Sequence, residues 1–107
     1  MLAFVPDLLF GSSVQAALTA AGHEVELVGA LEPGSVADVL VVDLCAEAPE
    51  RIEQVAGHRP AGAPALAFYS HVETDVKALA EQAGFELVVP RSRMAREGAA
   101  LVERLSA

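Results

Sequence analysis

Asp43 is the residue whose position says most about the chemistry open to this chain. It closes the apolar run Val39-Leu40-Val41-Val42, and Leu44-Cys45 follow it. An uninterrupted apolar run of this length is typical of a strand buried on both faces of a parallel sheet. A carboxylate that ends such a strand lies at the carboxyl edge of the sheet, where open α/β folds bind their ligands. The sequence therefore predicts where a functional site lies before it predicts what the site does.

Other polar side chains follow the remaining strand-like segments and are expected at the same edge. They are Asp7, Ser12, Ser70, His71, Arg91 and Ser92. One interpretation is structural: Asp7, Ser12 and Ser92 cap helices, and Arg91 forms an ion pair with Asp43. The other interpretation is a pocket for an anion or a small ligand, or a surface that contacts another protein. The residue types alone leave both interpretations open.

Familiar catalytic and cofactor motifs are missing from the sequence. Ser70 and His71 are adjacent, an arrangement in which side chains rarely face each other, and no Gly-x-Ser-x-Gly elbow occurs. The three histidines have no Cys or His partner at the spacing of a zinc site. The glycine-rich loops that hold dinucleotides or ATP are absent, and one Tyr with no Trp disfavours a flavin. We therefore expect a protein that is not an enzyme and has no cofactor.

The elements that would position these residues alternate in a regular order. Apolar segments at 2–5, 38–44, 65–69 and 86–89 read as strands, and the alternation of polar and apolar residues at 24–28 predicts a half-exposed edge strand. Helical spacing marks 10–21, 49–56, 76–83 and 99–105, with Gly22, Gly57 and Gly84 as helix ends. Residues 29–37 contain Pro33-Gly34-Ser35 and leave room for one helical turn at most. The pattern predicts one α/β domain over 1–107, a (βα)5 three-layer sandwich whose second helix is shortened or absent.

The chain resembles a bacterial response-regulator receiver domain across its length. The resemblance rests on the order and spacing of the stretches 20–25, 39–44, 66–70, 78–85 and 87–89. It implies a flavodoxin-like parallel sheet of strand order 2-1-3-4-5. It also implies that Asp43 occupies the phospho-acceptor position, that Ser70 is the hydroxyl that senses the phosphoryl group, and that Asp7 is one of two acids that hold Mg²⁺.

The sequence departs from the receiver pattern at two of these positions. Pro6 stands where the second acid is expected, and Val88-Val89 runs into Pro90-Arg91 where receivers carry a lysine. Asp7 and Asp43 would hold Mg²⁺ only weakly, because the ion is usually bound by several carboxylate, phosphate and water oxygens. Arg91 could pair with Asp43 and keep it occupied. These departures favour an unphosphorylated pseudo-receiver. A weak phospho-acceptor that uses Asp43 and Mg²⁺, and a small-ligand sensor at the carboxyl edge, remain the alternatives.

Charge and composition bear on partners and compartment. The net charge of −8 disfavours nucleic acid as a partner, and no apolar run is long enough to span a membrane. The single Cys45 and the lack of a basic leader predict a cytoplasmic protein. We expect a non-enzymatic signalling module that binds another protein, or itself as a homodimer. The candidate partner surface comprises Lys77, Arg93, Arg96 and Arg104.

Overall fold

A computed structural model describes residues 1–106, which form five strands and four helices, with a helix after every strand except β2. The strands are β1 (Leu2–Phe4), β2 (Glu26–Val28), β3 (Leu40–Asp43), β4 (Ala65–Tyr69) and β5 (Leu87–Pro90). The helices are α1 (Leu8–Ala20), α2 (Ala48–His58), α3 (Thr74–Gln82) and α4 (Arg91–Ser106). Of these helices, none is both long and apolar enough to cross a membrane.

The five strands form one parallel sheet of order β2-β1-β3-β4-β5. This is the flavodoxin-like order expected from the sequence, and the three central strands are buried along their whole length. Their apolar runs explain this burial, because a strand covered on both faces has no position for a solvated side chain. The predicted strands at 24–28 and 38–44 are shorter in the structure, where they span Glu26–Val28 and Leu40–Asp43.

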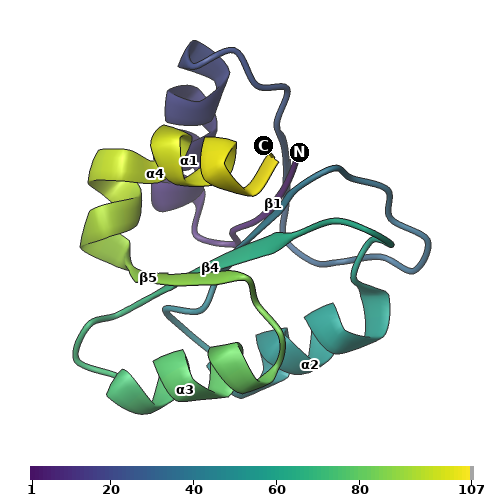
Figure 1. The fold of residues 1–107 in the computed structure, drawn as a ribbon, viewed down its shortest axis with the longest axis vertical. Helices are drawn as coiled ribbons and strands as arrows, with labels where there is room; N and C mark the ends of the chain where they lie inside the picture. The colour runs from purple at the N-terminus through teal and green to yellow at the C-terminus, as the bar shows by residue number, and fades with distance from the viewer. Residues whose placement is uncertain (107) are drawn as a thin grey trace.

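Helices cover both faces of the sheet, which gives the three layers seen in Figure 1. On one face α1 and α4 pack on side chains such as Val41, Leu66 and Phe68. On the other face α2 and α3 pack on alternate residues of the same strands, among them Val42 and Ala67. The period of two along each strand thus divides the apolar residues between two cores.

Helix ends agree with the sequence at some positions and differ at others. Asp7 caps α1, since its Oδ1 accepts a hydrogen bond of 3.0 Å from the Phe10 N–H. Gly22 and Gly84 follow α1 and α3 with φ angles of 96° and 93°, as predicted for helix ends. The capping expected of Ser12 and Ser92 is wrong, because both residues lie inside helices. Gly57 also lies inside α2, which continues to His58.

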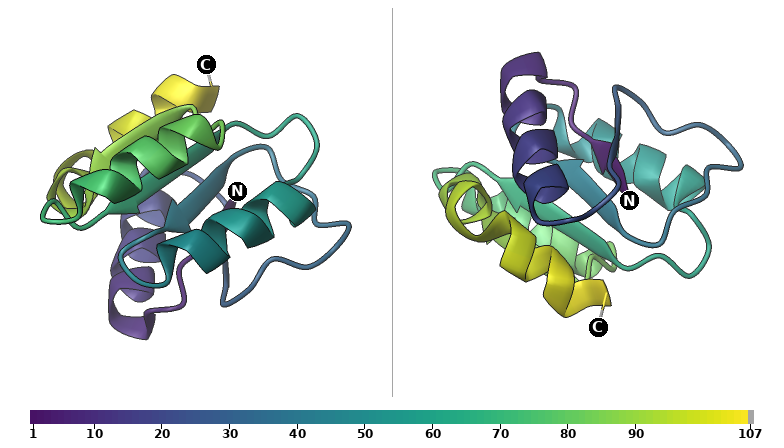
Figure 2. Two further views of the ribbon diagram at one scale, coloured as in Figure 1. Left: turned by 90° about the horizontal axis from the view of Figure 1, so that it is seen from below. Right: turned by 90° about the horizontal axis from the view of Figure 1, so that it is seen from above.

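The segment between β2 and β3 contains no helix, which confirms that the second helix of the (βα)5 pattern is missing. Figure 2 shows residues 29–39 as a loop beside the sheet. Leu31 from this loop is buried in the core, and its N–H donates to Gln54 Oε1 on α2. Val36 in the same loop is 92% exposed. One of the five helices of the pattern is therefore replaced by a loop whose buried apolar side chains are Leu31 and Val39.

Candidate functional site

Asp43 ends β3 at the carboxyl edge of the sheet, and its carboxylate is closed in. Only 4% of the residue is exposed. Its Oδ1 accepts a hydrogen bond of 2.7 Å from the Cys45 N–H, and its Oδ2 lies 3.5 Å from Arg51 Nη1. The same Nη1 donates to the Asp43 carbonyl oxygen at 2.9 Å. Both carboxylate oxygens are thus engaged by groups of this chain.

The cation that faces Asp43 is Arg51 and not Arg91, so the expected partner is corrected. Arg51 lies in the first turn of α2, where its N–H donates to the Glu47 carbonyl at 3.0 Å. Glu47 adopts a left-handed conformation with φ of 49°, which is uncommon for a residue with a side chain. This turn brings the chain back after β3, so that Arg51, eight residues later, reaches the strand end. The Arg51 side chain is only 12% exposed.

Arg91 has a different role at the same edge. Its guanidinium lies over the Phe10 ring, 4.1 Å from the ring centroid, a geometry that favours cation–π attraction. Phe10 in turn packs on Phe68 of β4, with ring centroids 5.1 Å apart. Among residues 1–106, ion pairs to carboxylates involve Arg51, Arg59, Arg93 and Arg96 but not Arg91. The guanidinium of Arg91 is therefore held by an aromatic face and keeps its charge available.

A hollow of about 480 Å³ opens beside Arg91. It brings together four of the predicted polar residues, and neither Asp7 nor Asp43 lines it. The lining residues are Phe10, Cys45, Ser70, His71, Arg91, Ser92 and Ala95. None of them carries a carboxylate, although the chain as a whole carries a net charge of −8. The hollow thus offers a cation, an imidazole and two hydroxyls to whatever enters it.

Cys45 also lines the hollow, but its thiol is a poor nucleophile. Burial raises the pKa of Cys45 to about 12, and the nearby Asp43 carboxylate adds to the effect, while Arg91 and Arg51 act in the opposite direction. The thiolate is the reactive form of cysteine. At neutral pH this side chain is therefore a small apolar filler, as its place beside a buried strand suggests.

The arrangement fits Mg²⁺ poorly. Asp7 is exposed and accepts from the Phe10 N–H as the cap of α1, while Arg51 competes with any cation for Asp43. Pro6 offers no side-chain oxygen. Within residues 1–106 no three His, Cys, Asp or Glu side chains come close enough to share an ion. Mg²⁺ prefers near-octahedral oxygen coordination, and these residues do not supply it.

The four bases of the candidate partner surface come from two helices that flank the edge strand β5. Lys77 lies on α3, and Arg93, Arg96 and Arg104 lie on α4. Arg93 Nε is 3.4 Å and Arg96 Nη2 is 3.7 Å from the same oxygen of Glu97. Surface pairs of this kind are weak, but they reduce the positive charge that α4 presents.

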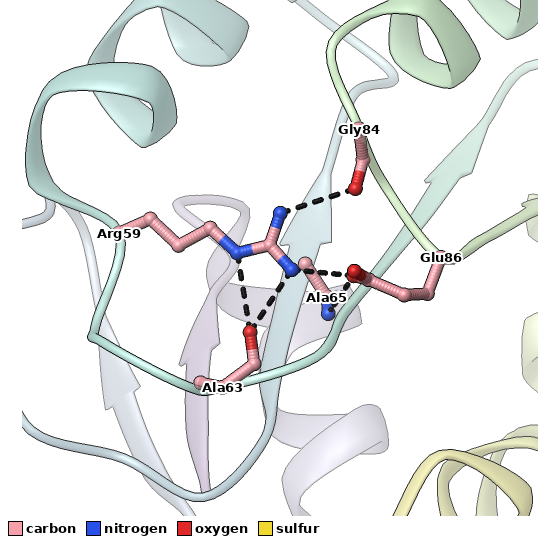
Figure 3. Close-up of polar contacts among 5 residues, drawn as sticks. All are labelled: Arg59, Ala63, Ala65, Gly84 and Glu86. Atoms are coloured by element: carbon pink, nitrogen blue, oxygen red, sulfur yellow. Dashed lines mark hydrogen bonds and ion pairs between the residues drawn. The ribbon is translucent and has the colours of Figure 1, made fainter.

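The opposite, amino edge of the sheet is closed by an arginine that the sequence analysis did not identify. Figure 3 shows Arg59, just after α2, donating to the Ala63 carbonyl at 3.1 and 3.0 Å and to the Gly84 carbonyl at 3.1 Å. It also pairs with Glu86, which accepts a further hydrogen bond of 2.7 Å from the Ala65 N–H. Burial alone would raise the pKa of Glu86, but the Ala65 N–H and Arg59 outweigh it and lower that pKa.

Comparisons with known proteins leave the fold as the firm result. No protein-family model, no curated protein and no solved structure matches this chain. The parallel sheet of order β2-β1-β3-β4-β5 with one helix missing establishes flavodoxin-like topology. The structure therefore supports the resemblance to receivers at the level of the fold alone.

Proposed function

We propose that this chain is a non-enzymatic, receiver-like module that acts by binding another protein and lacks a phosphorylation switch. The observation that carries the proposal is the closed state of Asp43. A carboxylate that receives a phosphoryl group must present an oxygen to the phosphorus atom in line with the leaving group. Here one oxygen accepts from the Cys45 N–H, and the other faces Arg51.

The surroundings of Asp43 support the same conclusion. Phosphoryl transfer depends on positioning and on neutralisation of the phosphate charge, usually by Mg²⁺ and a cationic side chain. Asp7 caps a helix, Pro6 replaces the second acid, and Arg91 lies over Phe10. An Arg–carboxylate pair with an added backbone hydrogen bond holds β3 and α2 in one fixed arrangement. A fixed arrangement suits constitutive binding.

Exposed apolar side chains favour a protein as the partner. Leu8 and Leu9, at the start of α1, expose 78% and 86% of their surface. They follow β1 at the carboxyl edge, the edge that also carries Arg91. Isolated exposed leucines are ordinary, but two in succession beside a hollow with an available cation are typical of a contact surface. This surface is a second candidate beside Lys77, Arg93, Arg96 and Arg104.

The phosphorylation part of the proposal is tested by amide NMR with Mg²⁺ and beryllofluoride, a mimic of the phosphoryl group. We expect the Cys45, Ser70 and Arg91 amides to keep their positions, while a phosphorylatable receiver measured in parallel shifts. Saturable shifts at these amides would show that Asp43 accepts the mimic, and the phospho-acceptor alternative would replace the proposal.

The binding part is tested by capturing partners from a lysate of the source cells with immobilised protein. Two double variants are compared with the wild type, Leu8→Ser/Leu9→Ser and Arg93→Glu/Arg96→Glu. Each must keep the melting temperature of the wild type, so that lost binding is not caused by unfolding. Loss of a bound protein with one pair and not the other assigns the surface. Wild type and Asp43→Asn are expected to retain the same protein. If neither surface pair changes what is retained, the proposal of a partner at these surfaces is wrong.

A small anionic ligand is the second candidate, and the hollow favours it. Arg91, His71, Ser70 and Ser92 converge there without a carboxylate. Inorganic phosphate, titrated while the amides of these residues are followed by NMR, is the simplest probe. Saturable shifts that disappear in Arg91→Ala and persist in the matched variant Arg104→Ala would favour a ligand sensor.

A further inference from the structure

The net negative charge of this protein arises in the first half of the chain. Residues 1–50 contain eight of the fifteen acidic residues and none of the seven Lys and Arg residues. In residues 51–107 the remaining seven acids are balanced by all seven bases. The first half supplies β2 and the loop 29–39, at the edge of the sheet opposite to β5. The side of the sheet at the outer strand β2 is therefore more acidic than the side at the outer strand β5.

A groove lined by residues of β1, β2 and the loop 29–39 lies on this acidic side of the sheet. We call it the β2 groove and define it by Leu2, Glu26, Val28, Ala30, Glu32 and Val36. Its volume is about 240 Å³, and an adjoining hollow of about 310 Å³ shares Leu2, Glu26 and Val36 with it. The side chains that line the two hollows include Glu24, Glu26 and Glu32 but no Lys or Arg. The groove thus combines apolar side chains with a rim of carboxylates.

The β2 groove lies where the fold lacks its second helix. On the face that carries α2 and α3, α3 packs on β4 and β5, whereas the loop 29–39 lies beside β2 (Figure 2). Val28 is only partly buried, and Val36 is 92% exposed. A helix laid over β2 would bury both valines, as the other helices bury the strands beneath them.

We propose that the β2 groove binds an amphipathic helix of another protein, one with an apolar stripe flanked by Lys and Arg. The apolar stripe would contact Val28, Ala30 and Val36. The flanking cations would meet Glu26 and Glu32, for which no ion pair to a base occurs among the described residues. The mode is that of a helix in a groove, with anchors at i, i+3, i+4 and i+7. This surface is separate from the carboxyl edge and does not depend on the state of Asp43.

A second copy of the chain does not fit this description. The one helix with several cations, α4, already buries its apolar stripe of Met94, Leu101 and Val102 in its own core. No other helix within residues 1–106 combines an unburied apolar stripe with flanking bases. The complementary helix therefore comes from a different protein.

The experiment uses a synthetic peptide of about 15 residues, long enough to form a helix on binding. Leucines stand at i, i+3, i+4 and i+7 and lysines flank them, and a scrambled peptide of the same composition is the control. Amide NMR of the full chain should show saturable shifts at Leu2, Val28, Ala30 and Val36. The scrambled peptide should give shifts at least about fivefold smaller at the same concentration. Absence of saturable shifts at these four residues would overturn the proposal.

Two pairs of variants separate the groove from general attraction to an acidic protein. Glu26→Gln/Glu32→Gln should weaken peptide binding at least about fivefold, whereas Glu73→Gln/Glu81→Gln, which removes the same charge elsewhere, should weaken it less than about twofold. Val36→Ser should weaken binding, and Val72→Ser, at another exposed valine, should not. Equal weakening in both charge pairs would show non-specific attraction. Concentration-dependent self-association that Val36→Ser abolishes would assign the groove to a second copy. Either result overturns the proposal.

Discussion

The carboxyl edge and the amino edge of the sheet, where the strands end and begin, each pair an arginine with a carboxylate, but they differ in what surrounds the pair. At the amino edge Arg59 donates to two carbonyls and to Glu86, and Glu86 also accepts from the Ala65 N–H. Every group in that network faces another group of the chain. At the carboxyl edge Arg51 and Asp43 are similarly paired. At the same edge, however, Arg91 lies over Phe10 and lines the hollow.

This difference shows how a structural ion pair can be told from a site. An arginine whose donors meet carbonyls and carboxylates of the same fold has fewer donors left for a ligand. An arginine held by an aromatic face retains its donors and its charge. By this criterion Arg51 and Arg59 stabilise the fold, and we propose Arg91 as the candidate residue for binding an anionic group.

The largest expected effect comes from breaking the carboxyl-edge pair. Arg51→Ala leaves the buried Asp43 carboxylate without its cation and should lower the free energy of unfolding by about 3 kcal/mol. Urea denaturation measures the change. Arg93→Ala, which removes an exposed pair on α4, is the control and should change stability by about 0.5 kcal/mol or less. A loss below about 1 kcal/mol for Arg51→Ala would mean that the pair does not fix Asp43.

Breaking the amino-edge network should have a somewhat smaller effect. Arg59→Ala should destabilise the fold by about 2 kcal/mol, because the carbonyls of Ala63 and Gly84 lose the donor that Arg59 supplies. Arg59→Lys should recover less than half of this loss, since an ammonium cannot reproduce the planar fork. Full recovery with lysine would show that charge, and not hydrogen-bond geometry, closes this edge. The same urea titrations decide between the two outcomes.

Acidification should act on the amino edge through Glu86. Its pKa is lowered in the folded state, so its contribution to stability is present above its ordinary value of 4.5 and is lost as the pH falls through the lower folded value. The free energy of unfolding, measured between about pH 6 and pH 3, should therefore fall less steeply in Glu86→Gln than in the wild type. Identical slopes would contradict the assignment. Glu81→Gln, an exposed acid on α3, serves as the matched control.

The last prediction concerns the reactivity of the Cys45 thiol and not the stability of the fold. With a pKa of about 12, its thiol should react with iodoacetamide at pH 8 at least about 100-fold more slowly than an unperturbed cysteine. Asp43→Asn removes one cause of the raised pKa and should speed the reaction. Arg59→Ala, which destabilises the other edge, controls for unfolding. If both variants speed alkylation equally, exposure and not charge limits the reaction.

The sequence predicted the fold because its strongest signals are apolar runs and glycines. The run before Asp43 and the stretch 65–69 have no polar interruption and are short, which favours buried strands over helices. The missing helix was predicted because Pro33-Gly34 left too few residues for one. Strand ends were predicted less well, since β2 and β3 are shorter than their apolar patterns.

The site was predicted in part. Ser70, His71, Arg91 and Ser92 were placed at one edge because parallel strands end together, and they line one hollow. The partner of Asp43 was missed, because a helical pattern does not show how the helix is turned relative to the preceding strand. A signal was nevertheless present: Arg51 is the first Lys or Arg in the chain and lies only eight residues after Asp43. The cation–π contact with Phe10 left no comparable signal.

Helix α2 carries one of the two arginine pairs at each end. Arg51 lies in its first turn and Arg59 directly follows its last residue. Helix α2, which is about 16 Å long, is therefore tied by one arginine to the carboxyl edge of the sheet and by the other to the amino edge. Helices ordinarily lose their terminal amide protons to solvent deuterium first, because the ends fray. In α2 fraying at either end requires an arginine to leave a carboxylate. We therefore expect its amides to exchange together, as one cooperative unit that joins the two edges.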